Sequence, residues 1–386
     1  MLPGMRVAFV LHSAKRDGAG KAFLELIDGL RGTEVQAMVL LPKAGPLAED
    51  INARGVRAVI VPYRWWMDRG TPAWTKAVRT IWNLLMALPV AVVLRLWKCE
   101  VVYTNTLTIS AGGFAARILR LPHVWHVHEL FGGETGFAFD LGEKLSLRLV
   151  NSLADACITV SEAAKAQLLP YMPLERIRTV YQSVSVPAKV AETLDRWAVR
   201  PEGVLVCAIV GSIFPLKRQE DAVRAIAILR RQGVRVGLSL IGEGNEEYLN
   251  RLVDLVASEQ LGNQTRFFGL LVDPFPVLGA ADVLLACSPV EACSRAIVEG
   301  MLLGKPAIAA RGGGNSELVQ DGFNGLLYES GDCNDLARCI RFLAENPGER
   351  MRLGANARVW AESRVSGPEY GQAILGILQS AAVRKA

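Results

Sequence analysis

The chain has 386 residues, of which 51% are hydrophobic and 21% charged, and its formal net charge is +5. This length favours two domains over one, and the hydrophobic content excludes a largely disordered chain. The positive charge is too small to indicate nucleic-acid binding.

Short apolar runs alternate with amphipathic stretches along the whole chain. Continuous apolar strands separated by helices predict parallel sheets covered on both faces. The series appears twice, so the predicted fold class is α/β, with two Rossmann-like, doubly wound parallel-sheet domains facing each other across a cleft. The predicted strands are 6–11, 35–41, 56–61, 100–104, 122–127 and 156–160, then 204–210, 235–241, 265–268, 282–286, 306–310 and 325–328; the predicted helices are 22–30, 111–120, 161–169, 219–231, 246–259, 335–345, 348–363 and 369–383.

The stretch 183–202 lacks strand periodicity and is predicted to connect the two domains. We expect an N-terminal domain over 1–190 and a C-terminal domain over 191–365, with a last helix in 366–386 that packs back on the first domain. The chain begins with a strand, and we expect no signal peptide. Seven scattered cysteines without a Cys-x-x-Cys pair favour a reducing compartment over a disulfide framework or a zinc site. A cytoplasmic location is therefore expected.

The loop after the first strand, Ser13 to Lys21, is rich in small residues around Gly18. Small residues let the backbone approach a phosphate or an acceptor closely. Gly18 is therefore a predicted site residue.

The segment 64–98 holds five of the eight tryptophans and six basic residues against a single aspartate. Tryptophan interleaved with basic residues favours an anionic membrane interface. The apolar run 81–94 is too short for a bilayer span, which needs ~20 residues, so peripheral binding is predicted. One alternative is base stacking on nucleic acid, which nothing else in the chain supports. The other is a core-packed helix with a solvated basic face.

The strand 122–127 ends in the sequence His126-Val127-His128-Glu129. Two histidines at a spacing of two on a strand point to the same side, which invites a zinc hypothesis. A third ligand at a matching spacing is not evident, so no metal is expected. The alternative is that both histidines are simply hydrogen-bonded residues at the end of the strand.

In the second half, Gly211 and Ser212 follow the strand 204–210 and precede Lys217 and Arg218. A glycine turn followed by a lysine at the mouth of a parallel sheet can place an ammonium on a departing diphosphate. An ordinary surface lysine near a helix start is the alternative.

The strand 282–286 leads into a loop that contains Glu291, and a helix begins near Ser294, with Glu299 eight residues after Glu291. A helix start offers free N–H groups and a positive dipole end to a pyrophosphate. Two flanking carboxylates could accept hydrogen bonds from sugar and ribose hydroxyls. From spacing alone, it is equally possible that Glu291 is a solvated side chain and Glu299 an ordinary residue on the helix face.

This stretch resembles the signature of the retaining glycosyltransferases of family 4, which have the GT-B fold. The matching pieces are Glu291 and Glu299, the strand entry Gly304-Lys305-Pro306 and the turn Gly313-Gly314-Asn315-Ser316-Glu317. The resemblance implies that Glu291 holds hydroxyls of the donor sugar and that Glu299 holds the nucleotide ribose. Where the family usually has Gly-Phe-Gly after the first glutamate, this chain has Ala292-Cys293-Ser294, which leaves the identity of the donor sugar in doubt.

The resemblance extends to the other loops. It places Lys217 at the family's phosphate lysine and Ser212 where an arginine is usual, with Arg218 or Arg295 as a compensating cation. It also implies that the segment of Phe268 and Gly269 packs on the base. In the first half it implies that His128 sits against the anomeric region of the donor, with a structural role for His126, and that the loop of Gly18 is the acceptor-side lip.

Together with these features, the resemblance implies a retaining, metal-independent transferase that moves a hexose-type sugar from a nucleoside diphosphate sugar to a lipid-linked or polysaccharide acceptor. It would act in the cytoplasm, peripherally on the inner face of the membrane, without a cofactor. An epimerase or hydrolase on the same fold, and an inactive donor-binding membrane partner of another transferase, are the alternatives. The predicted catalytic residues are His128, Glu291 and Lys217; the predicted donor-binding residues are Gly18, Gly211, Ser212, Arg218, Phe268, Gly269, Ala292, Cys293, Ser294, Arg295 and Glu299.

Overall fold

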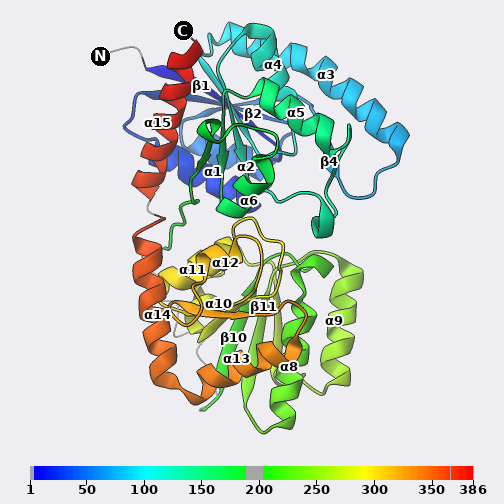
Figure 1. Cartoon of the computed structure of the whole chain (residues 1–386), viewed down its shortest axis with the longest axis vertical. Coiled ribbons are helices and arrows are strands. Elements are labelled where there is room, and N and C mark those ends of the chain that lie inside the picture. Colours follow the sequence, from blue (N-terminus) through cyan, green and yellow to red (C-terminus); the bar gives the residue numbers. More distant parts are fainter. Residues whose placement is uncertain (1–3, 188–202, 366, 386) are drawn as a thin grey trace. The chain divides into compact units, whose positions relative to one another are not determined.

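The computed structural model describes residues 4–187, 203–365 and 367–385. The chain divides into two compact units, Met1–Ser183 with Val365–Ala386, and Val184–Arg364, which Figure 1 colours along the sequence. Each unit is built around one parallel sheet. Most of the predicted connection, 188–202, lies outside the described residues.

Seven parallel strands form the sheet of the first unit, in the order β3-β2-β1-β5-β6-β8-β9. The central strands β5 and β6 are buried from end to end, as expected of a parallel sheet covered on both faces. The loops of Gly18 and His128 follow β1 and β6, on either side of β5. The strands are β1 (Met5–Leu11), β2 (Val35–Leu41), β3 (Arg57–Ile60), β5 (Val101–Asn105), β6 (His123–Val127), β8 (Ala156–Thr159) and β9 (Ile177–Thr179).

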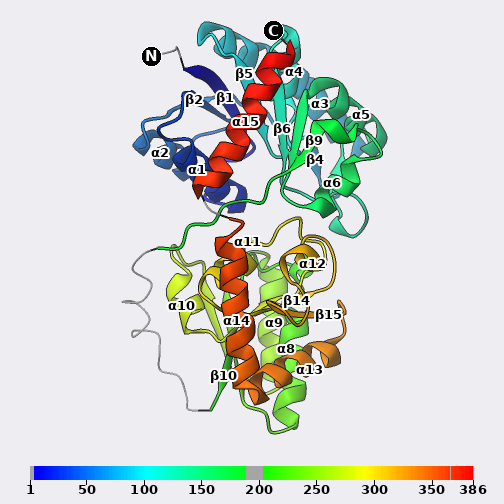
Figure 2. The ribbon, with the colours of Figure 1, turned by 60° about the vertical axis from the view of Figure 1, so that its left-hand side comes forward.

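The last helix of the chain belongs to the first unit, where it packs against the first helix (Figure 2). The two helices approach closely at two glycines: a Cβ on Gly371 would lie 2.2 Å from the carbonyl oxygen of Gly29. The helices of this unit are α1 (Gly18–Gly29), α2 (Pro46–Ala53), α3 (Ala73–Leu96), α4 (Ala111–Leu119), α5 (Glu143–Leu153), α6 (Glu162–Leu168) and α15 (Gly367–Lys385), and a short antiparallel ribbon pairs β4 (Met67–Asp68) with β7 (Ala138–Phe139).

Six parallel strands form the sheet of the second unit, in the order β12-β11-β10-β13-β14-β15. The order reverses between β10 and β13, and in such sheets ligands bind at the carboxyl ends of the strands beside that point. The strands are β10 (Leu205–Val210), β11 (Val236–Ile241), β12 (Thr265–Gly269), β13 (Val283–Ala286), β14 (Ala307–Ala310) and β15 (Gly325–Tyr328); the helices are α8 (Gln219–Arg231), α9 (Glu246–Ser258), α10 (Phe275–Ala280), α11 (Arg295–Leu302), α12 (Asn315–Leu318), α13 (Cys333–Glu345) and α14 (Pro347–Glu362).

The predicted fold class, two doubly wound parallel-sheet α/β domains, is confirmed. Each of the twelve predicted strands is present with ends within one residue of those predicted. The prediction missed the short strands β4, β7 and β9 and the helices α2, α5, α10 and α12. It also listed no helix over α3, whose 24 residues include the apolar run 81–94; a core-packed helix in this region was only an alternative.

Candidate active site

Lys217 and Glu291, two of the three predicted catalytic residues, form an ion pair in which Nζ donates to Oε1. They come from the loops that follow the neighbouring strands β10 and β13, at the point where the strand order of the second sheet reverses. The Lys217 side chain is 37% exposed and that of Glu291 17%. The pair therefore places one cation and one carboxylate together where a ligand of this sheet would bind.

Glycines in the loop after β14 hold the Glu291 loop in place. The N–H of Gly314 donates to the carbonyl oxygen of Glu291 at 2.7 Å. A Cβ on Gly314 would lie 2.0 Å from the carbonyl oxygen of Ala292, and one on Gly312, which has φ 142°, would lie 2.7 Å from that of Pro289. Backbone-to-backbone packing at this distance leaves no room for a side chain. The glycine-rich turn is thus the partner that shapes the loop of Glu291.

The loop of Glu291 ends at the start of α11. Ala292 and Ser294 are buried and Cys293 is partly buried, and Ser294 precedes the first helical residue, Arg295. The Arg295 guanidinium lies 3.9 Å from the carboxylate of Glu299, and both side chains are nearly buried. A cation in the first turn opposes the helix dipole, and Glu299 offsets that cost.

Arg218 is held by a different carboxylate. Its backbone is left-handed, with φ 50°, and its guanidinium donates to both carboxylate oxygens of the buried Asp221, at 2.9 and 3.0 Å. This hydrogen bond raises the pKa of Arg218. The pair fixes the start of α8, whereas Lys217, one residue earlier, reaches Glu291.

The loops after β10, β11 and β12 pack on one another through backbone atoms. A Cβ on Gly242 would lie 2.0 Å from the carbonyl oxygen of Gly211, and the Gly242 N–H donates to the carbonyl oxygen of Gly269 at 2.8 Å. Ser212 is exposed beside Gly211, and Phe268 is partly buried. Gly211, Ser212, Phe268 and Gly269 therefore all lie at the carboxyl edge of the second sheet.

In the first unit, His128 follows β6 and is held on both ring nitrogens. Its Nε2 lies 2.8 Å from Oδ1 of Asn105, and its Nδ1 is hydrogen-bonded to Nε2 of Gln182. Since an amide nitrogen only donates, Nδ1 accepts and Nε2 carries the proton that Asn105 accepts. These two contacts hold the ring in place at the end of the strand.

His126 lies fully buried on β6. Its Nδ1 is hydrogen-bonded to the hydroxyl of Tyr103, and burial lowers the pKa of His126 to about 3. The ring centroids of His126 and His128 are 4.0 Å apart. Among the described residues, no group of three or more His, Cys, Asp or Glu is arranged to hold a metal ion.

Gly18 is the first residue of α1, and Asp17 caps that helix by accepting from the N–H of Gly20 at 2.8 Å. Nε2 of His12 lies 3.5 Å from the Asp17 carboxylate. Burial alone would raise the pKa of Asp17, but the hydrogen bond and charge of His12 and the N–H of Gly20 lower it overall. The loop of Gly18 is therefore organised by a carboxylate.

The structure adds two residues that the sequence analysis missed, Asn105 and Gln182, and gives contacts for Glu129, which was named there without a role. Asn105, at the end of β5, and Gln182, just after β9, hold His128. Glu129 accepts from the N–H of Leu107 at 2.9 Å and from that of His128 at 3.1 Å, and burial raises the pKa of Glu129. A signal for Asn105 was available, because a polar residue ends an apolar strand there.

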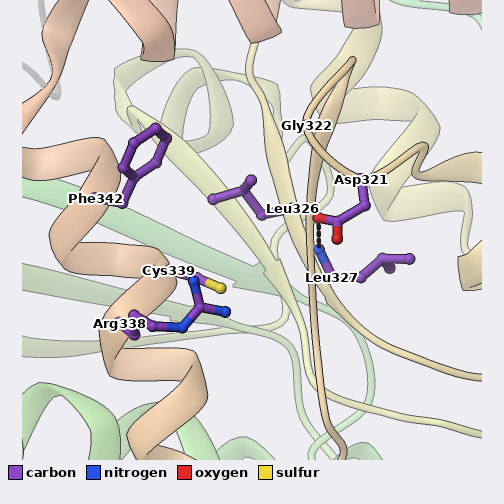
Figure 3. A pocket seen from close by; sticks show the side chains of 7 residues that line it. All are labelled: Asp321, Gly322, Leu326, Leu327, Arg338, Cys339 and Phe342. Carbon is purple, nitrogen blue, oxygen red and sulfur yellow. Dashed lines mark hydrogen bonds between the residues drawn. The ribbon is translucent and has the colours of Figure 1, made fainter.

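A separate pocket of about 310 Å³ lies in the second unit between β15 and α13 (Figure 3). Asp321 closes one side, and its Oδ1 accepts from the N–H of Leu327 at 2.9 Å. None of the residues that line this pocket is a predicted site residue. The lining residues are Asp321, Gly322, Leu326, Leu327, Arg338, Cys339 and Phe342.

Comparison with known proteins gives two family matches that together span most of the chain. Residues 192–360 match the family described as glycosyl transferases group 1, and residues 17–182 match the glycosyl transferase 4-like domain. A D-inositol 3-phosphate glycosyltransferase of Saccharomonospora viridis is 31% identical over 61% of this chain and 52% of that protein. The lipopolysaccharide core biosynthesis glycosyltransferase LpsD of Rhizobium meliloti is 27% identical over 59% and 64%. The chain aligns with about half the length of the curated relatives it matches.

Solved structures with the same fold cover nearly the whole chain. Anabaena Alr3699/HepE in complex with UDP has a TM-score of 0.81 and 23% identity, over 97% of this chain and all of that chain. Its complex with UDP-glucose has a TM-score of 0.80 at the same identity and coverage. The lipopolysaccharide outer core galactosyltransferase WaaB has a TM-score of 0.73 and 15% identity, over 97% and 99%. At these identities the likeness shows the fold.

Proposed function

Because the chain belongs to the glycosyl transferases group 1 family and has the GT-B fold, we propose that it transfers a hexose-type sugar from a nucleoside diphosphate sugar with retention of anomeric configuration. The proposed acceptor is lipid-linked or a saccharide. Relatives named for inositol phosphate and for lipopolysaccharide core transfer support this class of acceptor. Structures of the same fold named as complexes with UDP and UDP-glucose support the class of donor.

The observation that carries this proposal is the ion pair of Lys217 and Glu291 at the carboxyl edge of the second sheet. A bound diphosphate would take the ammonium of Lys217, which frees the Glu291 carboxylate to accept hydrogen bonds from sugar hydroxyls. The start of α11, a few residues after Glu291, offers backbone N–H groups and a positive dipole end to an anion, and Ser294 makes no side-chain cap hydrogen bond there. Both features would stabilise the negative charge of the departing diphosphate.

These protein groups are proposed to act in place of a divalent metal. Arg218 is paired with Asp221, which is not among the proposed site residues, and Arg295 lies 3.9 Å from Glu299. Lys217 is the cation paired with Glu291, the carboxylate proposed to bind the donor sugar. We propose that Glu299 holds the ribose and that His128, positioned by Asn105 and Gln182, contacts the donor sugar near its anomeric carbon.

The experiment that tests the function measures donor binding first and transfer second. Thermal-shift measurements with UDP-, GDP- and ADP-sugars identify the donor, because a bound ligand stabilises the fold by mass action. Transfer to a saccharide or lipid-linked acceptor is then followed by nuclear magnetic resonance of the product, with an α-linked product expected from an α-linked donor. An inverted product contradicts retention. Release of free sugar or of an epimer in the absence of acceptor indicates the hydrolase or epimerase, and donor binding without turnover indicates an inactive partner protein.

A further inference from the structure

A stripe of exposed apolar side chains runs the length of α3, the long helix at the edge of the first unit in Figure 1. Its members recur every three or four residues, which puts them on one face of the helix. Each is between 53% and 80% exposed, although all are large hydrophobic residues. A contiguous apolar surface of this size on a folded protein marks an interaction site. We call it the α3 stripe: Trp74, Val78, Ile81, Leu85, Leu88, Val92 and Leu96.

The opposite face of α3 is part of the core of the first unit. Val90, Ala91 and Leu94 are buried in a cluster that includes residues of β1, β5 and α4, and Asn83 accepts a hydrogen bond from the N–H of Arg64 at 2.8 Å. By length and composition alone, α3 is the described helix that could cross a membrane, so the expectation that this region is too short for a span was wrong. To span a bilayer, α3 would have to leave the fold, which would expose the buried residues of α4 and of the sheet that pack against it.

Most of the charged residues that border the stripe are basic; the exception is the exposed Glu100, just after α3, which lies 3.8 Å from Arg6. The sequence 73–99 contains no aspartate or glutamate, and Arg95 and Lys98 are exposed where α3 ends. Arg117 and Arg120 are exposed at the end of α4, which packs against α3. An apolar face bordered by cations is complementary to a bilayer interface with anionic headgroups.

The prediction of a membrane interface also depended on tryptophans and basic residues whose side chains make contacts within the protein. Trp66 is buried, and its indole N–H donates to the carbonyl oxygen of Leu107 at 2.7 Å. Arg79 is held between Asp68 and Asp140. The exposed apolar surface of this region is therefore the aliphatic stripe, with Trp74 at one end, rather than the cluster of tryptophans and basic residues as a whole.

We infer that α3 is a monotopic membrane helix, which lies in the plane of an anionic bilayer with its stripe among the acyl chains and its inner face still packed in the protein. A second copy of the chain fits the stripe less well, because pairing two stripes would bring two sets of cations together without a carboxylate on either helix. The purpose of this contact rests on the proposed function, since it would bring a lipid-linked acceptor to the enzyme.

The test is flotation of the full chain with vesicles of phosphatidylcholine alone and of phosphatidylcholine mixed with phosphatidylglycerol. The variant L85Q/L88Q replaces two stripe residues that are already exposed, so the fold should persist. Its matched control is L169Q/L174Q, which changes two exposed leucines outside α3. We expect the wild type and the control to float with the mixed vesicles, less so at high salt. We expect binding of L85Q/L88Q to fall at least about tenfold, because burial of each leucine favours the bound state.

Three results would overturn the inference: no binding of the wild type to either vesicle, equal binding of L85Q/L88Q, or dimerisation of the wild type in solution that L85Q/L88Q abolishes. Melting temperature and nucleotide-sugar binding, measured without vesicles, should be unchanged in L85Q/L88Q. Failure of the membrane contact is thus separated from failure of the proposed transferase activity.

Discussion

The rings of His126 and His128 lie 4.0 Å apart, yet their surroundings differ completely. His126 is sealed in the core with Tyr103, whereas His128 is partly exposed between Asn105 and Gln182. We predict that His128→Ala lowers sugar transfer more than tenfold with the fold intact. His126→Ala should instead destabilise the protein by about 1–3 kcal/mol, since it leaves a buried hydroxyl without its partner. Turnover and urea denaturation of both variants check this division; equal catalytic loss at unchanged stability would contradict it.

The buried His126 also predicts a pH dependence of stability. Burial lowers its pKa in the folded state to about 3, from an ordinary value of 6.5, and its Nε2 has no hydrogen-bond partner among the described residues. The unfolded chain therefore binds a proton that the folded chain refuses, so stability is lost as the pH falls below about 6.5. At pH 5 the loss should be about 2 kcal/mol relative to pH 7.

His126→Gln is the control for this prediction, because glutamine keeps a hydrogen-bonding group near Tyr103 but does not titrate. Between pH 7 and pH 5, the unfolding free energy of the wild type should therefore fall relative to that of His126→Gln. A constant difference would show that His126 becomes protonated in the folded protein.

The sequence predicted the main sheets because each strand is a continuous apolar run bounded by helices. The strands β4, β7 and β9 have two or three residues each, too few to produce a periodic pattern. Composition alone could not distinguish a tryptophan of the core from one at the surface. Trp66 illustrates this, since its indole partner lies 41 positions away in the chain.

The site was predictable where a motif is local and not where its partners are distant. The spacing of Glu291 and Glu299 lies within one loop and helix, but the ion pair of Glu291 joins residues 74 positions apart. The partners of His128 come from the end of β5 and from just after the missed strand β9. Contacts of this kind are set by strand order, which the sequence pattern does not encode.

Metal independence is the third prediction. If Lys217 and the start of α11 stabilise the departing diphosphate, transfer should continue at an unchanged rate in excess EDTA. The rate is measured by release of the nucleoside diphosphate, with and without added manganese or magnesium. Loss of activity in EDTA that either metal restores would assign the electrostatic role to a metal.

The ion pair itself provides the fourth prediction. Lys217→Met should lower turnover by about a hundredfold or more, because it removes the charge proposed to balance the diphosphate. Glu291→Gln should lower turnover more than donor affinity, and Glu299→Ala should mainly weaken donor binding. Arg358→Met is the control, since it removes a cation from an exposed ion pair with Glu362 on α14. Wild-type kinetics in the Lys217 and Glu291 variants would remove this pair from the mechanism.

The glycine that supports the Glu291 loop provides the last prediction. A Cβ on Gly314 would lie 2.0 Å from the carbonyl oxygen of Ala292, so Gly314→Ala must displace the backbone on which Glu291 is carried. We expect turnover to fall at least tenfold, because a shift of about 1 Å at a reacting group can cost a hundredfold in rate. We also expect a loss of about 1–3 kcal/mol in stability.

Gly348→Ala is the matched control: its Cβ would meet nothing within 4 Å, and it lies in the first turn of α14. That change should be neutral or slightly stabilising, since alanine favours the helix. Kinetics and denaturation of both variants separate a local effect on the loop from a general cost of replacing glycine.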